Sequence, residues 1–249
     1  MYLCKDIEES CYIDDSNPRI MLLQRKLPSQ FQFRTYPGVY AKRIVVPYGV
    51  TQIGVGYFED WKCAEEILIP CTVKKILTYA FRGCSSLKSI SIPDSVEYIG
   101  DYAFEDCTSL KDIRLSNNLK DIGNSAFTNT SIEFLELPKS YKVFEPETLY
   151  DMNNLKYLVC RSEESYYHCL HYCKNVEKIR FDGMQCMTDR SLLLGSKVKE
   201  IVFTGDIKEF NATFLDIPYH GDLRVLIPRG TRVINLRGLY WYKLIEYDP

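Results

Sequence analysis

Leu87-Lys-Ser-Ile90-Ser-Ile92-Pro93-Asp-Ser-Val96-Glu-Tyr-Ile99-Gly100-Asp-Tyr-Ala103-Phe104-Glu-Asp-Cys107-Thr-Ser-Leu110 is the stretch of sequence that decides the fold. A second copy starts at Leu110, so the chain repeats after 23 residues. With Ile90 as the anchor, an aliphatic residue recurs every 21 to 24 residues, at Ile44, Ile67, Ile90, Ile113, Leu135, Leu158, Ile179, Ile201 and Val225. The residue two positions after each anchor is also apolar. A period of this length is the signature of a solenoid of stacked coils.

Each repeat predicts the same local structures. Leu-x-x-Ile-x-Ile-Pro alternates with a period of two, which indicates a short strand that the proline ends. Gly54, Gly100 and Gly123 follow, where a positive φ would turn the chain. Ala-Phe-x-x-Cys is long enough for one helical or 3₁₀ turn. We therefore predict an α/β solenoid, a right-handed superhelix of about nine coils of about 23 residues with a parallel β-sheet on its concave face.

The repeat also resembles a known family. Leu-x-x-Ile-x-Ile-Pro-x-x-Val-x-x-Ile-Gly-x-x-Ala-Phe-x-x-Cys is similar to the BspA-like, Treponema-type class of leucine-rich repeats, most clearly in residues 67–84 and 90–107. The resemblance implies a solenoid for protein recognition. Family members are often bacterial surface or secreted proteins that adhere to host proteins, and the family pattern contains no catalytic residue. We therefore expect no enzyme activity and no cofactor.

The repeat divides the chain into three parts. Residues 1–38 lack the repeat and are predicted to form an N-terminal cap over the first coil. Residues 39–228 form the leucine-rich repeat solenoid, and residues 229–249 form a C-terminal strand and cap.

Composition limits the partners and the location. The formal net charge of −2 supplies no basic field for nucleic acid. No window is apolar enough to span a membrane. The N-terminus carries charges where an export signal needs apolar residues, so we expect a cytoplasmic chain as given, although relatives are often surface or secreted.

The predicted binding surface lies on the concave sheet. Residues on either side of each anchor point outward, because successive side chains of a strand alternate between its faces. In the middle coils these positions combine aromatic and charged residues, a composition typical of interface hot spots. The candidate residues for a protein partner are Arg114, Phe134, Glu136, Tyr157, Lys178 and Arg180. A solvated face with mixed charges and no partner is the alternative.

Two other functions stay open. The chain could be a structural or adhesive unit that self-associates end to end through its caps. Residues 160–173 could hold zinc, because Cys thiolate and His imidazole are zinc ligands. That candidate set is Cys160, His168, Cys169, His171 and Cys173, although Cys160 and Cys173 already hold core positions in the repeat. The absence of any CxxC pair among the ten cysteines argues against zinc and for thiols that are mostly reduced and buried.

Overall fold

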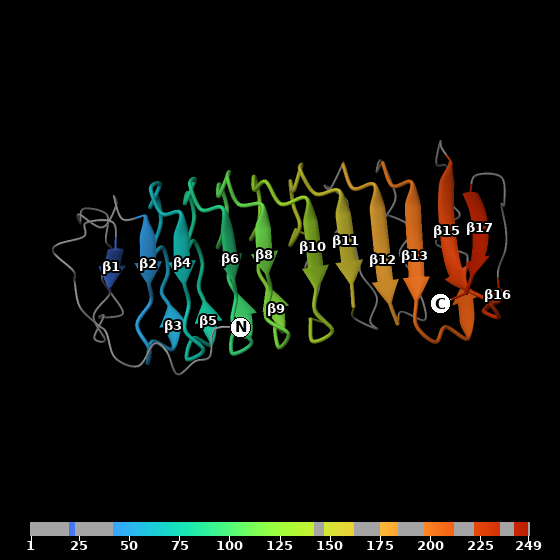
Figure 1. The fold of residues 1–249 in the computed structure, drawn as a ribbon, viewed down its shortest axis with the longest axis horizontal. Coiled ribbons are helices and arrows are strands. Elements are labelled where there is room, and N and C mark those ends of the chain that lie inside the picture. Colours follow the sequence, from blue (N-terminus) through green and yellow to red (C-terminus); the bar gives the residue numbers. More distant parts are fainter. Residues whose placement is uncertain are drawn as a thin grey trace.

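The computed structural model describes residues 20–22, 42–141, 147–161, 175–183, 197–211, 222–234 and 242–248. Figure 1 shows an elongated row of strands that advances along the molecule in sequence order, with the first strands at one end and the last at the other. Every strand pair found among these residues is parallel. The chain is therefore a parallel-strand β-solenoid, as the repeat predicts.

The strands form two sets. One set, which we call the long-strand sheet, contains β1 (Ile20–Leu22), β2 (Arg43–Val45), β4 (Glu66–Leu68), β6 (Ser89–Ser91), β8 (Asp112–Arg114), β10 (Phe134–Leu137), β11 (Tyr157–Cys160), β12 (Lys178–Asp182), β13 (Glu200–Thr204), β15 (Leu223–Pro228) and β17 (Tyr242–Tyr247). The other set contains the shorter β3 (Gln52–Ile53), β5 (Lys75–Ile76), β7 (Tyr98–Ile99), β9 (Asp121–Ile122), β14 (Glu209–Asn211) and β16 (Arg232–Ile234).

All nine predicted anchors lie in the long-strand sheet. Equivalent anchors face each other across hydrogen-bonded pairs, as Ile44 does with Ile67 and Ile90 with Ile113. The hydrogen-bonded ladder is divided into the groups β1-β2-β4, β6-β8 and β10-β11-β12-β13-β15-β17. Strands β4 and β6 lie next to each other in Figure 1 without forming one ladder. The register repeats as expected, but the pairing is less continuous than a single sheet.

Strand β1 lies within the segment assigned to the N-terminal cap. It pairs with β2 so that Met21 faces Ile44, which is 23 residues later. The sheet thus continues one period before the first anchor found in the sequence. At the other end, β17 pairs with β15 and is the last strand of the six-stranded group.

The prediction of a helical or 3₁₀ turn is wrong for the described residues, which contain no helix. In its place, four successive coils make consecutive turns with two left-handed residues four positions apart, such as Tyr79 with Gly83 and Tyr102 with Asp106. Left-handed residues interrupt a right-handed helix. The freed amides bond to the following coil; for example, Phe81 N donates to Ala103 O over 2.8 Å. The turns therefore join neighbouring coils instead of forming local helices, so the α part of the predicted α/β class is not observed.

Glycine is required in the turns for a different reason than the positive φ expected from the sequence. Gly100 and Gly123 do not adopt the left-handed conformation. A Cβ atom on Gly100 would lie 2.5 Å from Thr78 N, and one on Gly123 would lie 2.4 Å from Asp101 N. Glycine is required here because the backbone of the preceding coil approaches too closely for any side chain.

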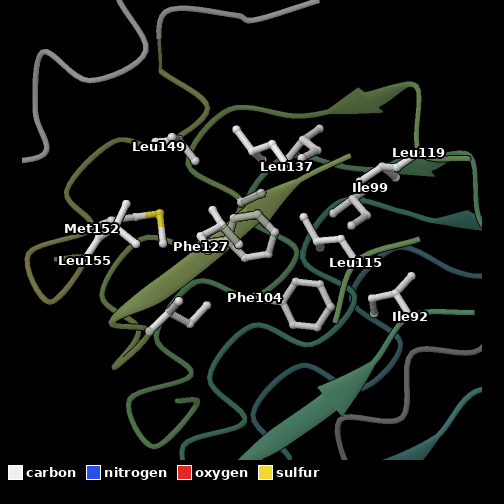
Figure 2. Close-up of a cluster of buried hydrophobic side chains, with 14 of the residues drawn as sticks. Ile92, Ile99, Phe104, Leu115, Leu119, Phe127, Leu137, Leu149, Met152 and Leu155 are labelled. Carbon is white, nitrogen blue, oxygen red and sulfur yellow. The ribbon is translucent and has the colours of Figure 1, made fainter. Parts of the chain in front are cut away.

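The core is a series of columns in which equivalent residues stack from coil to coil. Phe58, Phe81, Phe104 and Phe127 form one column, with ring centroids 5.0 to 5.7 Å apart and nearly parallel planes. Figure 2 shows Phe104 and Phe127 among aliphatic side chains from neighbouring coils. All four rings are fully buried. A continuous core of this kind stabilises each coil only through its neighbours.

The cysteines at the repeat position belong to this core. Cys84 and Cys107 are fully buried, and their thiols donate to Phe58 O over 3.2 Å and to Phe81 O over 3.1 Å. The neighbouring Cys107 thiol and burial raise the pKa of Cys84. Cys160 is also buried and forms no disulfide, which confirms the expectation for these three cysteines. Cys71 differs, because it is disulfide-bonded.

Candidate functional site

The outward face of strands β10 to β12 brings most of the predicted binding residues together. Phe134, Tyr157 and Lys178 face one another in register on these three strands. Glu136, Val159 and Arg180 do the same two residues later. Backbone pairing therefore fixes the positions of the side chains relative to one another before any partner binds.

An aromatic pair lies at the centre of this group. The rings of Phe134 and Tyr157 meet edge to face, with centroids 5.3 Å apart and planes at 73°. The Lys178 ammonium lies 5.4 Å from the centroid of the Tyr157 ring, within the range of a cation–π contact. Phe134 is 47% exposed, whereas the other phenylalanines within the described ranges are buried in the core. Large apolar side chains left in water are candidates for contact with another molecule.

Charged residues surround the aromatic pair and are held by ion pairs. Arg180 Nε lies 2.7 Å from Asp182 Oδ1, and this hydrogen bond is the main cause that raises the pKa of Arg180. Arg161 lies 2.8 Å from Glu136 and 3.8 Å from Asp182. Thr204 Oγ1 also donates to the Asp182 carboxylate. The result is a preorganised polar surface in which the arginines have few conformations left to lose on binding.

Arg114 lies at the margin of this group. It is on β8, which does not pair with β10 in the ladder. Its guanidinium is directed to the preceding coil, where it lies 3.0 Å from Asp94 Oδ1 and 3.3 Å from Ile92 O. Arg114 therefore stabilises the stacking of its own coil more directly than it contributes to the aromatic surface.

Arg161 and Asp182 were not among the candidate residues, although the sequence contains a signal for them. Both occupy the position after the second apolar residue, where Pro47, Pro70 and Pro93 stand in other coils. Without proline, β12 and β13 extend to five residues each, whereas β4 and β6 have three. Proline ends a strand because it has no amide hydrogen. The missing proline therefore marks an additional polar position, but it does not determine strand length by itself, since β8 also lacks it and has three residues, whereas β15 ends at Pro228 and has six.

The other candidate sites have less structural support. Of the predicted zinc ligands, only Cys160 is described, and it is buried and forms no disulfide; His168, Cys169, His171 and Cys173 lie outside the described residues. Within the described part of the chain there is no cluster of three or more metal-binding side chains. Nor do these residues contain a helix with the length and hydrophobicity for a membrane span.

Comparisons with known proteins agree with the repeat. A family model described as "BspA type Leucine rich repeat region" matches residues 31–156 with six copies. The crystal structure of a leucine-rich repeat protein from T. pallidum has a TM-score of 0.52 at 21% identity, over 68% of this chain and 75% of that one. A leucine-rich repeat protein from Eubacterium ventriosum has a TM-score of 0.48 at 19% identity, over 84% of this chain and 60% of that one. The comparison with curated proteins found no match.

Proposed function

Since this chain belongs to the BspA-type leucine-rich repeat family, we propose that it is a non-enzymatic module that binds a protein partner on the outward face of its long-strand sheet. Proteins of this type generally serve in protein interaction or adhesion. The observation that supports this face is the exposed Phe134 in contact with the half-buried Tyr157, with Lys178 and Arg180 on the adjoining strand. We also propose the finer geometry expected from the sequence, namely about nine coils and a concave curvature of this face.

Three features of this face suit protein recognition. The aromatic rings offer a large contact area with few rotatable bonds, so little entropy is lost on binding. Lys178 and Arg180 provide charged hydrogen-bond donors beside the rings, and the adjoining strands hold them in register. The ion pairs of Arg161 and Arg180 with Asp182 keep the surface in one arrangement. Together these features describe an anchor of aromatic residues within a polar rim, the usual composition of an interface.

A triple substitution tests the proposal. The variant with Phe134→Ala, Tyr157→Ala and Arg180→Ala is expected to lose capture of the native partner by at least about tenfold, since single hot-spot residues contribute about 2 kcal/mol. Its melting temperature is expected to change little, because these side chains lie on the outward face. The control is Arg82→Ala, Tyr102→Ala and Tyr150→Ala, which removes residues of similar chemistry from the turns.

The two variants together decide the outcome. Loss of capture in the first variant and retention in the control support the long-strand face. Equal capture by both, at equal stability, contradicts it.

End-to-end self-association is the second candidate function. Strand β17 is the last strand of its sheet, and Ile245 on it is 38% exposed. The final strand of a sheet can add a strand from another chain. Light scattering of the purified chain distinguishes the two functions: a monomer that captures another protein supports the face, and concentration-dependent oligomers support the ends.

A further inference from the structure

The last three long strands carry a second group of outward residues, apart from the aromatic pair. Val202, Leu226 and Ile245 face one another in register on β13, β15 and β17. Ile245 is 38% exposed, and Val202 and Leu226 are each partly exposed. We call these three residues the aliphatic strip. Burying an in-register row of partly exposed aliphatic side chains against another apolar side chain is favourable, because it removes apolar surface from water.

The charges beside the strip do not balance. Two residues before each member of the strip, the outward positions are occupied by Glu200, Arg224 and Lys243, which are also in register. Glu200 is bound on both sides, because it lies 2.6 Å from Lys178 and 2.7 Å from Arg224. Lys243 lies next to Arg224 and, within the described residues, forms no ion pair. Two cations side by side on adjacent strands repel each other, and a bound anion would remove that repulsion.

Elsewhere in this column, charged neighbours have opposite signs. Arg43 faces Glu66 at 3.1 Å on the first strands, beside the outward aliphatic pair Val45 and Leu68. In that region the charges beside the apolar surface already neutralise each other.

A second pair of like charges lies on this face, but without an apolar surface beside it. Lys88 and Lys111 lie in neighbouring coils at the start of β6 and β8, and Lys88 is paired with Glu65. The outward residues beside them are Ser89, Ser91, Asp112 and Arg114, so no apolar surface adjoins them. Only the strip beside Arg224 and Lys243 combines excess positive charge with exposed aliphatic side chains among the described strands.

Building on the proposed function, we propose that the aliphatic strip with Arg224 and Lys243 binds a segment of the partner protein in which acidic residues alternate with aliphatic ones. The aliphatic side chains of that segment lie against Val202, Leu226 and Ile245, and its carboxylates lie against the two cations. Three strands about 4.8 Å apart span about 10 Å from the first to the third, which is the length of about three extended residues. The recognised segment is therefore short.

The experiment uses the full chain and fluorescently labelled synthetic peptides of 12 residues, measured by fluorescence polarisation, with 12 being about the length that covers the strip with flanks. Three peptides are compared: one alternating Leu with Asp, one with Lys in place of each Asp, and one with Ser in place of each Leu. The Leu–Asp peptide is expected to bind, and to bind less tightly as salt is added. The other two peptides are expected to bind at least about tenfold more weakly.

Variants of the chain provide the decisive comparison. The double variant Arg224→Glu with Lys243→Glu is expected to reverse the preference, so that the Leu–Lys peptide binds more tightly than the Leu–Asp peptide. Leu226→Ser is expected to weaken the Leu–Asp peptide about tenfold. The matched controls Lys111→Glu and Leu68→Ser are expected to leave its affinity unchanged, since they change the same residue types where charge and apolar surface do not coincide.

Three results would overturn the proposal: equal or absent binding of the Leu–Asp and Leu–Lys peptides, a control that acts as strongly as its counterpart, or self-association that depends on Ile245. The proposed function fails separately. If the Phe134, Tyr157 and Arg180 variant loses partner capture but the chain shows no peptide preference, the proposed binding face is supported and only the acidic–aliphatic segment is ruled out. If that variant keeps partner capture, the proposed function itself is contradicted, whatever the peptides do.

Discussion

Stacking of equivalent side chains in neighbouring coils predicts a specific energetic coupling within the phenylalanine column. Phe104 is fully buried, and its ring lies 5.0 Å from Phe81 and 5.7 Å from Phe127, with 16° between the planes in both cases. Phe104→Ala is expected to lower the free energy of unfolding by about 4 to 5 kcal/mol, the upper part of the range for a buried phenylalanine, because two ring contacts are lost with the cavity. Phe104→Leu keeps most of the volume and is expected to cost about 1 to 2 kcal/mol.

A double-mutant cycle isolates the contact. Phe104→Leu and Phe127→Leu are expected to show a coupling energy of about 0.5 to 1.5 kcal/mol, the size of one stacked pair. The control cycle combines Phe104→Leu with Phe203→Leu, whose ring stacks on Phe181 at 5.3 Å in a distant coil. Those two changes are expected to add within about 0.5 kcal/mol.

The assay for both cycles is urea unfolding followed by circular dichroism and tryptophan fluorescence, with coincident curves as the test that one transition is observed. Equal coupling in the two cycles would refute the idea that adjacent coils stabilise each other through stacked rings.

Three further predictions concern the turns, one carboxylate and the thiols. Gly100→Ala is expected to cost about 1 to 3 kcal/mol in urea unfolding, because its Cβ would meet the preceding backbone, whereas Gly54→Ala, with its nearest atom at 3.5 Å, is expected to be nearly neutral. A hydrogen bond from the Asn117 backbone amide lowers the pKa of Asp94, so its stabilising contribution is present above the ordinary value of about 4 and is lost as pH falls below it. Wild type is therefore expected to exceed Asp94→Asn in stability at about pH 6, with the difference gone at about pH 2; an unchanged difference contradicts this assignment. In the folded chain a thiol reagent is expected to modify the partly exposed Cys63 and, until urea is added, to spare Cys84, Cys107 and Cys160.

The sequence predicted the repeat and its register because burial determines both. An anchor that recurs every two dozen residues has one arrangement in which all copies pack against the same core, and Ile44, Ile67, Ile90 and the partly buried Ile113 adopt it. The sequence did not predict the left-handed turns at Tyr79 and the equivalent residues. Tyrosine has no preference for that conformation, which is imposed by hydrogen bonds to the next coil.

The candidate surface was predictable in part for a similar reason. Alternation along each strand places Phe134, Tyr157 and Lys178 outward, which the structure confirms. Ion pairs depend on where long side chains extend, so the direction of Arg114 toward Asp94 could not be deduced from its position in the repeat. Strand β17 follows β15 by fewer residues than the regular period, and the aliphatic strip therefore emerged only from the three-dimensional register.

Register between coils is the central claim, and methyl-to-methyl NOEs measure it directly. In a deuterated chain with labelled isoleucine δ1 methyl groups, Ile44 is expected to show a cross-peak with Ile67, and Ile90 with Ile113, because neighbouring strands lie about 5 Å apart. Ile67 and Ile113, two coils apart and about 10 Å from each other, are expected to show none. A Ile67–Ile113 cross-peak, or the absence of both neighbouring cross-peaks, would contradict the stacked solenoid and the binding surface that depends on it.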